Sequence, residues 1–181
     1  VKLVNNKMPH VKLMIIGDGD YSEYQKLAQE LGIAEQVLFT GVQKNPFALL
    51  VRADVYALTS DSEGFPNALI EAMAVGLPCV SVNCKTGPAE ILQNDYQQCD
   101  AQDKVYHADY GILTPVFYDG KNLDASMISQ EEEIFAGELV ELLLNQKLMT
   151  SYRNKALYRA NQFGVDAYVR EIDRLIAQEL E

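Results

Sequence analysis

The sequence predicts an α/β fold, in which a doubly wound, Rossmann-like parallel sheet of about five strands is covered by helices on both faces. Short apolar runs of strand length alternate with segments that have the periodicity of a helix. Strands that alternate with helices form parallel sheets through right-handed crossovers. The length of 181 residues and the apolar content of 48% are those of one globular domain.

Five apolar runs are expected to form the strands. Each is bounded by Gly, Pro or polar turn residues. They comprise residues 11–16, 37–40, 55–59, 78–82 and 111–114. Residues 94–109 are polar and have no clear period, so we expect irregular structure there.

Helices are expected between the strands. In the first of them, Tyr24, Leu27, Ala28 and Leu31 recur at the spacing of one helix face, and Gly32 follows where a C-cap would lie. The other helices of this part comprise a short one opened by Asn45-Pro46 and residues 67–75 and 87–92.

The C-terminal part is expected to be helical. Its three helices comprise residues 130–145, 148–162 and 167–180. In the last helix we expect one apolar face to point inward, and its side chains are Tyr168, Ile172, Leu175 and Ile176.

The net charge argues against nucleic acid as a partner. The 15 Lys and Arg residues against 26 Asp and Glu residues leave a formal charge of −11, whereas binding to nucleic acid phosphates needs clustered cations. Residues 1–85 hold 7 basic and 9 acidic residues, and residues 86–181 hold 8 and 17. The first half is therefore the better host for an anionic ligand.

The sequence contains no pattern typical of a membrane span, a signal peptide or a metal site. No apolar run approaches the ~18 residues of a transmembrane helix. The cysteines Cys79, Cys84 and Cys99 lack metal-ligand spacing, and we expect Cys79 and Cys84 to be small buried hydrophobic side chains. These observations favour a cytoplasmic protein.

One loop combines several groups that can bind a ligand at the carboxyl end of a strand, where doubly wound folds bind theirs. Glu63 is expected at the strand tip and Glu71 in the helix that follows, while Gly64 lets the backbone approach a ligand. The free N–H groups of Asn67–Leu69 at the helix start would form an anion site. Because carboxylates accept hydrogen bonds from sugar hydroxyls, the loop can hold a polyol beside a phosphate.

This loop and its neighbours resemble the C-terminal, nucleotide-sugar-binding domain of the family 4 (group 1) retaining glycosyltransferases, which have the GT-B fold. The resemblance extends from about residue 11 to residue 163. The matching segments are Ile16-Gly17-Asp18-Gly19, Phe39-x-Gly41, Asn45-Pro46, Glu63-Gly64-Phe65-Pro66, Glu71-Ala72-Met73-Ala74, Gly76-x-Pro78, Gly87-Pro88-x-Glu90-Ile91 and Tyr110-Gly111-Ile112-Leu113.

The resemblance implies a role for individual residues. Glu63 is implied to be catalytic and to face the donor sugar, and Glu71 to hold the ribose hydroxyls. The other implied donor-binding residues are Gly17, Gly41, Gly64, Phe65, Asn67, Ala68 and Leu69. No metal or other cofactor is implied, because the donor is a nucleotide diphosphate sugar such as a UDP-sugar or a GDP-sugar. The whole enzyme would transfer this sugar with retention of configuration in polysaccharide or glycoconjugate synthesis.

The resemblance also implies parts that lie outside residues 1–181. These are an N-terminal acceptor domain, which could bring the protein to the inner membrane face, and a first strand and helix whose Arg and Lys grip the diphosphate. The missing strand would lie between residues 11–16 and 55–59. Those strands would then pair directly, residues 1–4 would fill the gap, or another chain would supply the strand, as in a homodimer. We expect the chain, a single donor-binding domain, to be inactive alone.

Two alternatives stay open, a non-catalytic interaction module derived from this fold and a nucleotide-binding regulator without sugar chemistry. A nicotinamide-dependent enzyme is disfavoured, because Ser22 replaces the third Gly of the dinucleotide fingerprint that begins at Gly17. A glycosidase is disfavoured because nothing in the sequence indicates that Glu63 and Glu71 flank a scissile bond.

Overall fold

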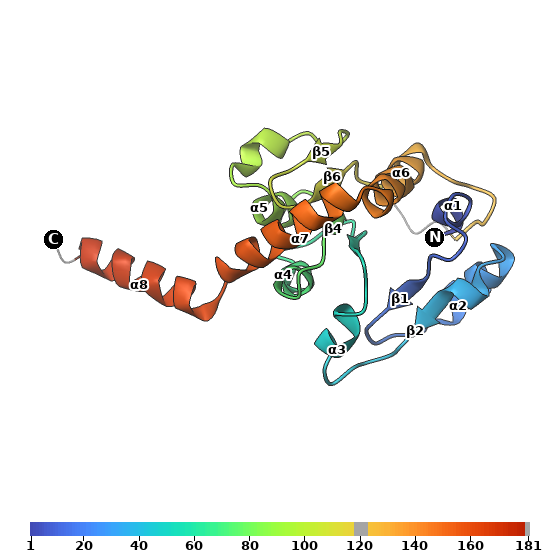
Figure 1. Cartoon of the computed structure of the whole chain (residues 1–181), viewed down its shortest axis with the longest axis horizontal. Coiled ribbons are helices and arrows are strands. Elements are labelled where there is room, and N and C mark those ends of the chain that lie inside the picture. Colours follow the sequence, from blue (N-terminus) through green and yellow to red (C-terminus); the bar gives the residue numbers. More distant parts are fainter. Residues whose placement is uncertain (118–122, 180–181) are drawn as a thin grey trace.

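The structure, a computed structural model, describes residues 1–117 and 123–179 (Figure 1). Its larger sheet has the strand order β3-β4-β6-β5, with β5 antiparallel to β6 and the other pairs parallel. In this register Tyr56 lies opposite Cys79, and Val80 lies opposite Ile112. The strands are β3 (Tyr56–Leu58), β4 (Cys79–Val82), β5 (Tyr106–His107) and β6 (Ile112–Thr114).

A second, smaller sheet pairs β1 (Leu13–Ile15) with β2 (Val37–Phe39) in parallel. The helices are α1 (Lys2–Asn5), α2 (Ser22–Glu30), α3 (Phe47–Leu50), α4 (Asn67–Ala74), α5 (Pro88–Leu92), α6 (Gln130–Leu144), α7 (Gln146–Asn161) and α8 (Val165–Glu179), with the short turns η1 (Ala34–Gln36) and η2 (Tyr96–Cys99). The α/β class and the predominance of parallel strands agree with the prediction from the sequence.

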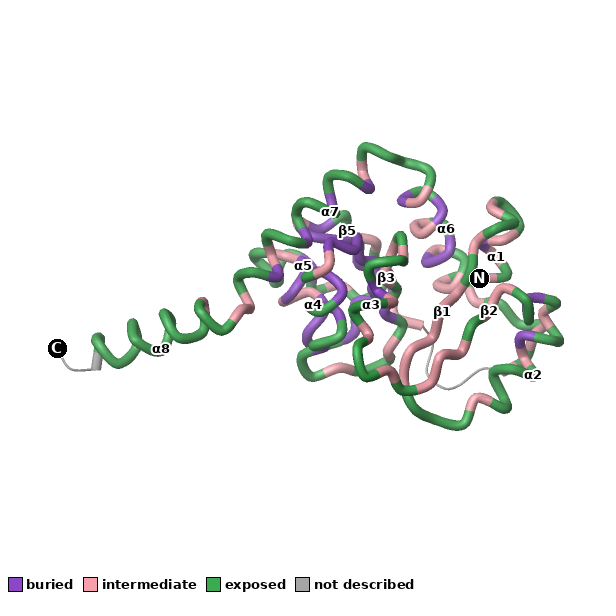
Figure 2. Tube along the Cα trace, turned by 60° about the horizontal axis from the view of Figure 1, so that its bottom comes forward, coloured by how far each residue is buried: buried purple, intermediate pink, exposed green. Residues whose placement is uncertain are grey.

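The core lies on both faces of the larger sheet, because successive side chains of a strand point to opposite faces. Cys79 packs on one face with the apolar sides of α4, α5 and α7, while Val80 and Val82 pack on the other with α6 and the start of α7. Figure 2 shows that the buried residues concentrate around this sheet and the helices beside it. Helices therefore cover both faces, as the doubly wound prediction requires.

The strands do not form the single sheet that was expected. No strand pairing among the described residues joins β1 to β3, so the sheet is interrupted where the missing strand was expected. Residues 1–4 do not fill this gap, because most of them belong to α1, where Val4 packs against Ala136 and Val140 of α6. Two of the three arrangements considered, direct pairing of β1 with β3 and filling of the gap by residues 1–4, are therefore not seen among the described residues.

Two further expectations were wrong. Residues 94–109 contain η2 and β5, and β5 is only two residues long, which is too short for its period to be recognised. The expected inward face of α8 is exposed, with Tyr168, Ile172, Leu175 and Ile176 between 38% and 68% exposed. The reason is the course of α8, which projects away from the rest of the molecule (Figures 1 and 2). Periodicity specifies that a helix has an apolar face but not which element covers it.

In the part of the chain that the structure describes, no helix combines the length and apolar character needed to span a bilayer.

A contact between a histidine and a largely buried carboxylate joins β5 to α6. The Nε2 atom of His107 lies 3.2 Å from Oε2 of Glu138. Burial raises the pKa of Glu138 above its ordinary value, and Glu141 adds to this effect, while His107 opposes it. Because the folded-state pKa is the higher one, the ionised carboxylate opposes folding at neutral pH, and this cost disappears below the unfolded-state pKa.

We predict that Glu138→Gln raises the unfolding free energy at about pH 8, since it removes a partly desolvated charge. The gain shrinks as the pH falls through the raised pKa of Glu138 toward the ordinary value of about 4.3. Urea unfolding followed by circular dichroism over this pH range measures the effect. Exposed Glu133→Gln on the same helix is the control, and a natural chain more stable than Glu138→Gln at pH 8 would contradict the prediction.

Candidate functional site

The loop between β3 and α4 presents Glu63, Gly64 and Phe65 at the carboxyl end of the larger sheet. It is placed by α4, whose Leu69 and Met73 are completely buried against the sheet. Glu63 is half-buried, whereas Glu71 is exposed on the second turn of α4. An added Cβ atom at Gly64 would meet no atom within 4 Å, so this backbone borders open space.

The loop between β4 and α5 holds the first loop in place. Gly87 has a φ of +93°, and an added Cβ atom would lie 2.5 Å from Cδ of Pro66 and 3.1 Å from the Gly64 carbonyl oxygen. The Thr86 hydroxyl donates a hydrogen bond to the Glu63 carbonyl. These contacts fix the backbone on both sides of Gly64.

Glu63 and Glu71 both affect the pKa of Tyr56. Burial raises the pKa of Tyr56 on β3 to about 12, and the charges of Glu63 and Glu71 are among the groups that raise it further. Burial also raises the pKa of the Cys84 thiol, again with a contribution from Glu63. Glu63 belongs to the loop after β3 and Glu71 to the second turn of α4, so the two carboxylates affect Tyr56 from different elements.

The N-terminus of α4 has no side-chain cap. Leu69 is buried and its N–H donates to the Pro66 carbonyl at 3.0 Å, so this group is already used. Asn67 and Ala68 are exposed, and among the described residues their N–H groups have no hydrogen-bond partner. These two N–H groups at the positive end of the helix dipole can receive an anion beside the carboxylates.

The structure brings Gly17 and Gly41 together at the ends of β1 and β2. The Gly17 N–H donates to the Gly41 carbonyl at 3.2 Å, and the Tyr21 hydroxyl donates to the Gly17 carbonyl. The φ of Gly41 is +67°, a value that favours glycine. No hydrogen bond among the described residues connects this pair to the loop that carries Glu63.

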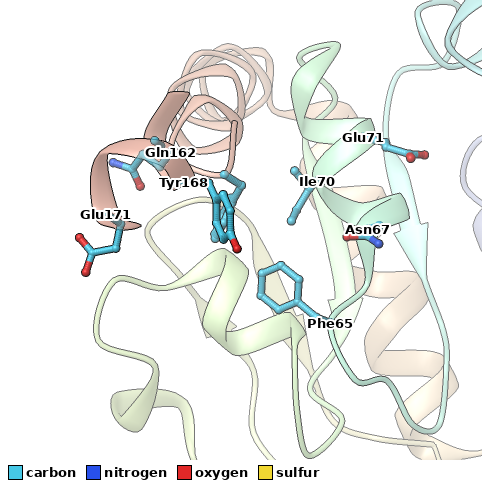
Figure 3. Close-up of a pocket in the computed structure, with 9 residues that line it drawn as sticks. Phe65, Asn67, Ile70, Glu71, Gln162, Tyr168 and Glu171 are labelled. Atoms are coloured by element: carbon cyan, nitrogen blue, oxygen red, sulfur yellow. The ribbon is translucent and has the colours of Figure 1, made fainter. Parts of the chain in front are cut away.

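A cleft of about 470 Å³ lies between α4 and the start of α8. In Figure 3 the rings of Phe65 and Tyr168 lie near Ile70, while the Glu71 carboxylate points away from them. The cleft thus shares α4 with the carboxylate site but has an apolar centre. Its lining residues are Phe65, Asn67, Ile70, Glu71, Gln162, Phe163, Ala167, Tyr168 and Glu171.

Sequence reasoning did not identify several residues that shape the site. Tyr56 is an ordinary strand residue by pattern, and Phe163 lies almost a hundred residues from Phe65, which it meets at 5.6 Å between ring centroids. For Thr86 the sequence offers one signal, because this residue directly precedes the Gly87-Pro88 segment of the matched motif.

Within residues 1–117 and 123–179, no cluster of three or more His, Cys, Asp or Glu is placed to hold a metal ion. Cys79 and Cys84 are free and buried, as predicted.

Comparison with known proteins identifies the family. The model of the family described as glycosyl transferases group 1 matches residues 1–104, which is more than half of the chain. The chain belongs to the glycosyl transferases group 1 family. This confirms the resemblance found in its motifs.

Two relatives illustrate the range of sequence identity between this group 1 chain and known glycosyltransferases. An uncharacterised glycosyltransferase of Methanocaldococcus jannaschii is 35% identical over 179 residues, covering 97% of this chain and 44% of the relative. The N-acetylgalactosamine-N,N'-diacetylbacillosaminyl-diphospho-undecaprenol 4-alpha-N-acetylgalactosaminyltransferase of Campylobacter jejuni is 30% identical over 154 residues, covering 84% of this chain and 35% of the relative. The chain therefore spans less than half the length of these relatives.

Solved structures share the fold at low sequence identity. The pneumococcal O-GlcNAc transferase GtfA, in complex with UDP and GlcNAc, has a TM-score of 0.71 at 16% identity over 100% of this chain and 32% of its own. Anabaena Alr3699/HepE, in complex with UDP-glucose, has a TM-score of 0.69 at 22% identity over 98% of this chain and 44% of its own. These likenesses show the GT-B type of fold that the motifs predicted.

We predict that Gly87→Ala destabilises the chain by about 1–3 kcal/mol, because the new methyl group meets Pro66 and Gly64 at a strained φ. Urea unfolding measures the change. The matched control is Gly137→Ala in α6, where a methyl group meets open space, and helix propensity predicts a gain of up to about 1 kcal/mol. Equal effects of the two substitutions would contradict this account of the loop contact.

Proposed function

We propose that residues 1–181 are the donor-binding domain of a retaining, hexosyl-type glycosyltransferase that takes its sugar from a nucleotide diphosphate. The observation that carries the proposal is the arrangement of the loop between β3 and α4, which places Glu63 beside the open backbone of Gly64 and Glu71 on the second turn of the helix that follows. The uncapped N–H groups of Asn67 and Ala68 lie at the start of the same helix. Carboxylates for hydroxyl groups next to N–H donors for phosphate suit a sugar nucleotide.

In this proposal each group has one task. Glu71 accepts hydrogen bonds from the ribose hydroxyls, and the Asn67 and Ala68 N–H groups face the diphosphate. Glu63 faces the donor sugar, where its negative charge stabilises the positive charge that develops on the sugar ring in the transition state. Gly64 and Phe65 line the sugar and phosphate, and the Gly17 and Gly41 loops approach the nucleoside.

The names of relatives support the substrate class. One solved neighbour is complexed with UDP and GlcNAc, and another with UDP-glucose. The Campylobacter jejuni relative is named as an N-acetylgalactosaminyltransferase acting on a diphospho-undecaprenol glycan. We therefore propose a UDP-sugar before a GDP-sugar as donor, and the synthesis of a polysaccharide or glycoconjugate as the process.

We further propose that the complete active site needs a partner region outside residues 1–181. The chain spans 44% of the length of the Methanocaldococcus jannaschii relative, and β1 and β3 each have an edge that pairs with no strand in residues 1–117 and 123–179. Leu38 on β2 is 57% exposed and Ala57 on β3 is exposed, although strands of this kind are normally buried on both faces. A parallel strand from an N-terminal domain or from a second copy would complete the sheet.

A second candidate function is nucleotide binding without sugar transfer. The observation behind it is that no Lys or Arg side chain among the described residues forms a hydrogen bond or ion pair with residues 59–66, so none is held against this loop. Diphosphate binding through N–H groups alone would be weak. Equal affinity for UDP and for UDP-sugars would favour this candidate.

We predict that the chain binds UDP or UDP-glucose weakly and that Glu71→Ala reduces the affinity about 10- to 100-fold, since hydrogen bonds to a charged group contribute about 1.5–3 kcal/mol. Isothermal titration calorimetry with UDP, GDP and their sugar conjugates measures the affinity and the base preference. Glu133→Ala, an exposed acidic residue of α6, is the control. No binding by the folded chain, or the same binding by Glu71→Ala, would contradict the proposed donor site.

We predict that the isolated chain associates through the open strand edges at micromolar concentration. Size-exclusion chromatography with light scattering would then give a mass above 20.2 kDa, and Ala57→Lys on β3 would lower it. Leu144→Lys on α6 is the control, because that side chain is also exposed but lies outside both sheets. A monomer of ordinary stability would contradict the proposed strand site.

A further inference from the structure

Arg159 on α7 is held by an unusually complete set of contacts. Its Nε donates to the Ile91 carbonyl at 2.9 Å, and its Nη2 donates to the Glu90 carbonyl at 2.8 Å. Its Nη1 donates to Oε1 of Gln162 at 2.6 Å. All three nitrogens of the guanidinium group therefore already have protein acceptors, and two of these are the carbonyls at the end of α5.

The guanidinium group also lies over two aromatic rings. Its central carbon lies 4.9 Å from the ring centroid of Tyr110 and 4.8 Å from that of Phe163. A planar guanidinium group that contacts two rings and donates through all three of its nitrogens has an orientation that the ammonium group of Lys cannot reproduce. A cation is also favourable at the C-terminal end of α5, where helix carbonyls lack partners.

Two routes connect Arg159 to the loop that carries Glu63. The first runs along α5, whose C-terminal carbonyls Arg159 binds and whose N-cap Gly87 packs against Gly64 and Pro66. Thr86, the residue before Gly87, donates to the Glu63 carbonyl. A displacement of this short helix would therefore displace the backbone at Glu63.

The second route runs through the aromatic rings. Phe163, on which the guanidinium group stacks, meets the Phe65 ring edge-on with 5.6 Å between centroids. Phe65 follows Gly64 directly and is 44% exposed, and the Phe163 ring is one of its contacts. Arg159 thus acts on Glu63 through α5 and on Phe65 through Phe163, one residue on each side of Gly64.

We propose that Arg159 is a positioning residue that sets the Glu63–Phe65 turn in the geometry needed for the donor, although it does not touch the donor itself. This inference rests on the proposed function of the turn as the donor sugar site. In this role Arg159 contributes to affinity for the sugar part of the donor more than to the stability of the fold. A Lys at this position keeps the charge but loses the paired carbonyl contacts and the stacking.

The test compares Arg159→Lys with Arg153→Lys, an exposed position on the same helix. Backbone amide chemical shifts from NMR report the turn without any ligand, and calorimetry with UDP-glucose and UDP reports donor binding. For Arg159→Lys we expect a cooperative urea unfolding transition, altered amide shifts at Glu63, Gly64 and Phe65, and about tenfold weaker binding of UDP-glucose with a smaller change for UDP. Arg153→Lys is expected to leave all three readouts as in the natural chain.

The outcomes separate this inference from the proposed function. Unchanged amide shifts of the turn in folded Arg159→Lys overturn the positioning role, whatever the ligand binding shows. A larger loss of affinity for UDP than for UDP-glucose also overturns it, because Glu63 in the turn is assigned to the sugar. If the natural chain binds neither ligand, the proposed function fails while the amide shifts still decide whether Arg159 sets the turn. Thr86→Val, which breaks only the first route, is expected to shift Glu63 more than Phe65.

Discussion

The arrangement of this chain depends on the burial of β4 from both sides. All four residues of Cys79–Val82 are buried, and their alternate side chains enter two separate clusters. One cluster holds α4, α5 and α7 on the sheet, and the other holds α6. Because burial of each apolar side chain contributes about 1.5–3 kcal/mol, the central strand and its neighbours β3 and β6 form the rigid part of the molecule.

The candidate site follows from this rigid centre. Parallel strands in register end at the same edge, so the loops after β3 and β4 lie side by side. Close contact between them requires a glycine at position 87, because any side chain there would collide with Pro66 and the Gly64 backbone. The backbone at Glu63 thereby acquires a fixed position although most of its loop is exposed to solvent. Arg159 on α7 binds carbonyls at the C-terminal end of α5, whereas Gly87 lies at the N-terminal end of the same helix.

Away from this centre, the chain exposes apolar surface that its own residues do not cover. Among the residues that the structure describes, β1 and β3 each have an edge without a strand partner, and the apolar face of α8 points into solvent. The relatives from Methanocaldococcus jannaschii and Campylobacter jejuni are more than twice as long as the matched part. The exposed surfaces and the difference in length together motivate the proposal that a partner region completes the fold.

The sequence by itself determined the α/β class and most of the strands and helices, because these depend on local periodicity and on the Gly and Pro residues that end each element. It also determined the family, because the family's motifs occur in a fixed order. It also determined the loop with Glu63 and Glu71 as the candidate site. Only the tertiary structure decided that the strands divide into two sheets, that α8 projects with its apolar face uncovered, and that Arg159 and Phe163 support the turn. Each of these depends on contacts between residues far apart in the chain, and periodicity specifies which face of an element is apolar but not which element meets it.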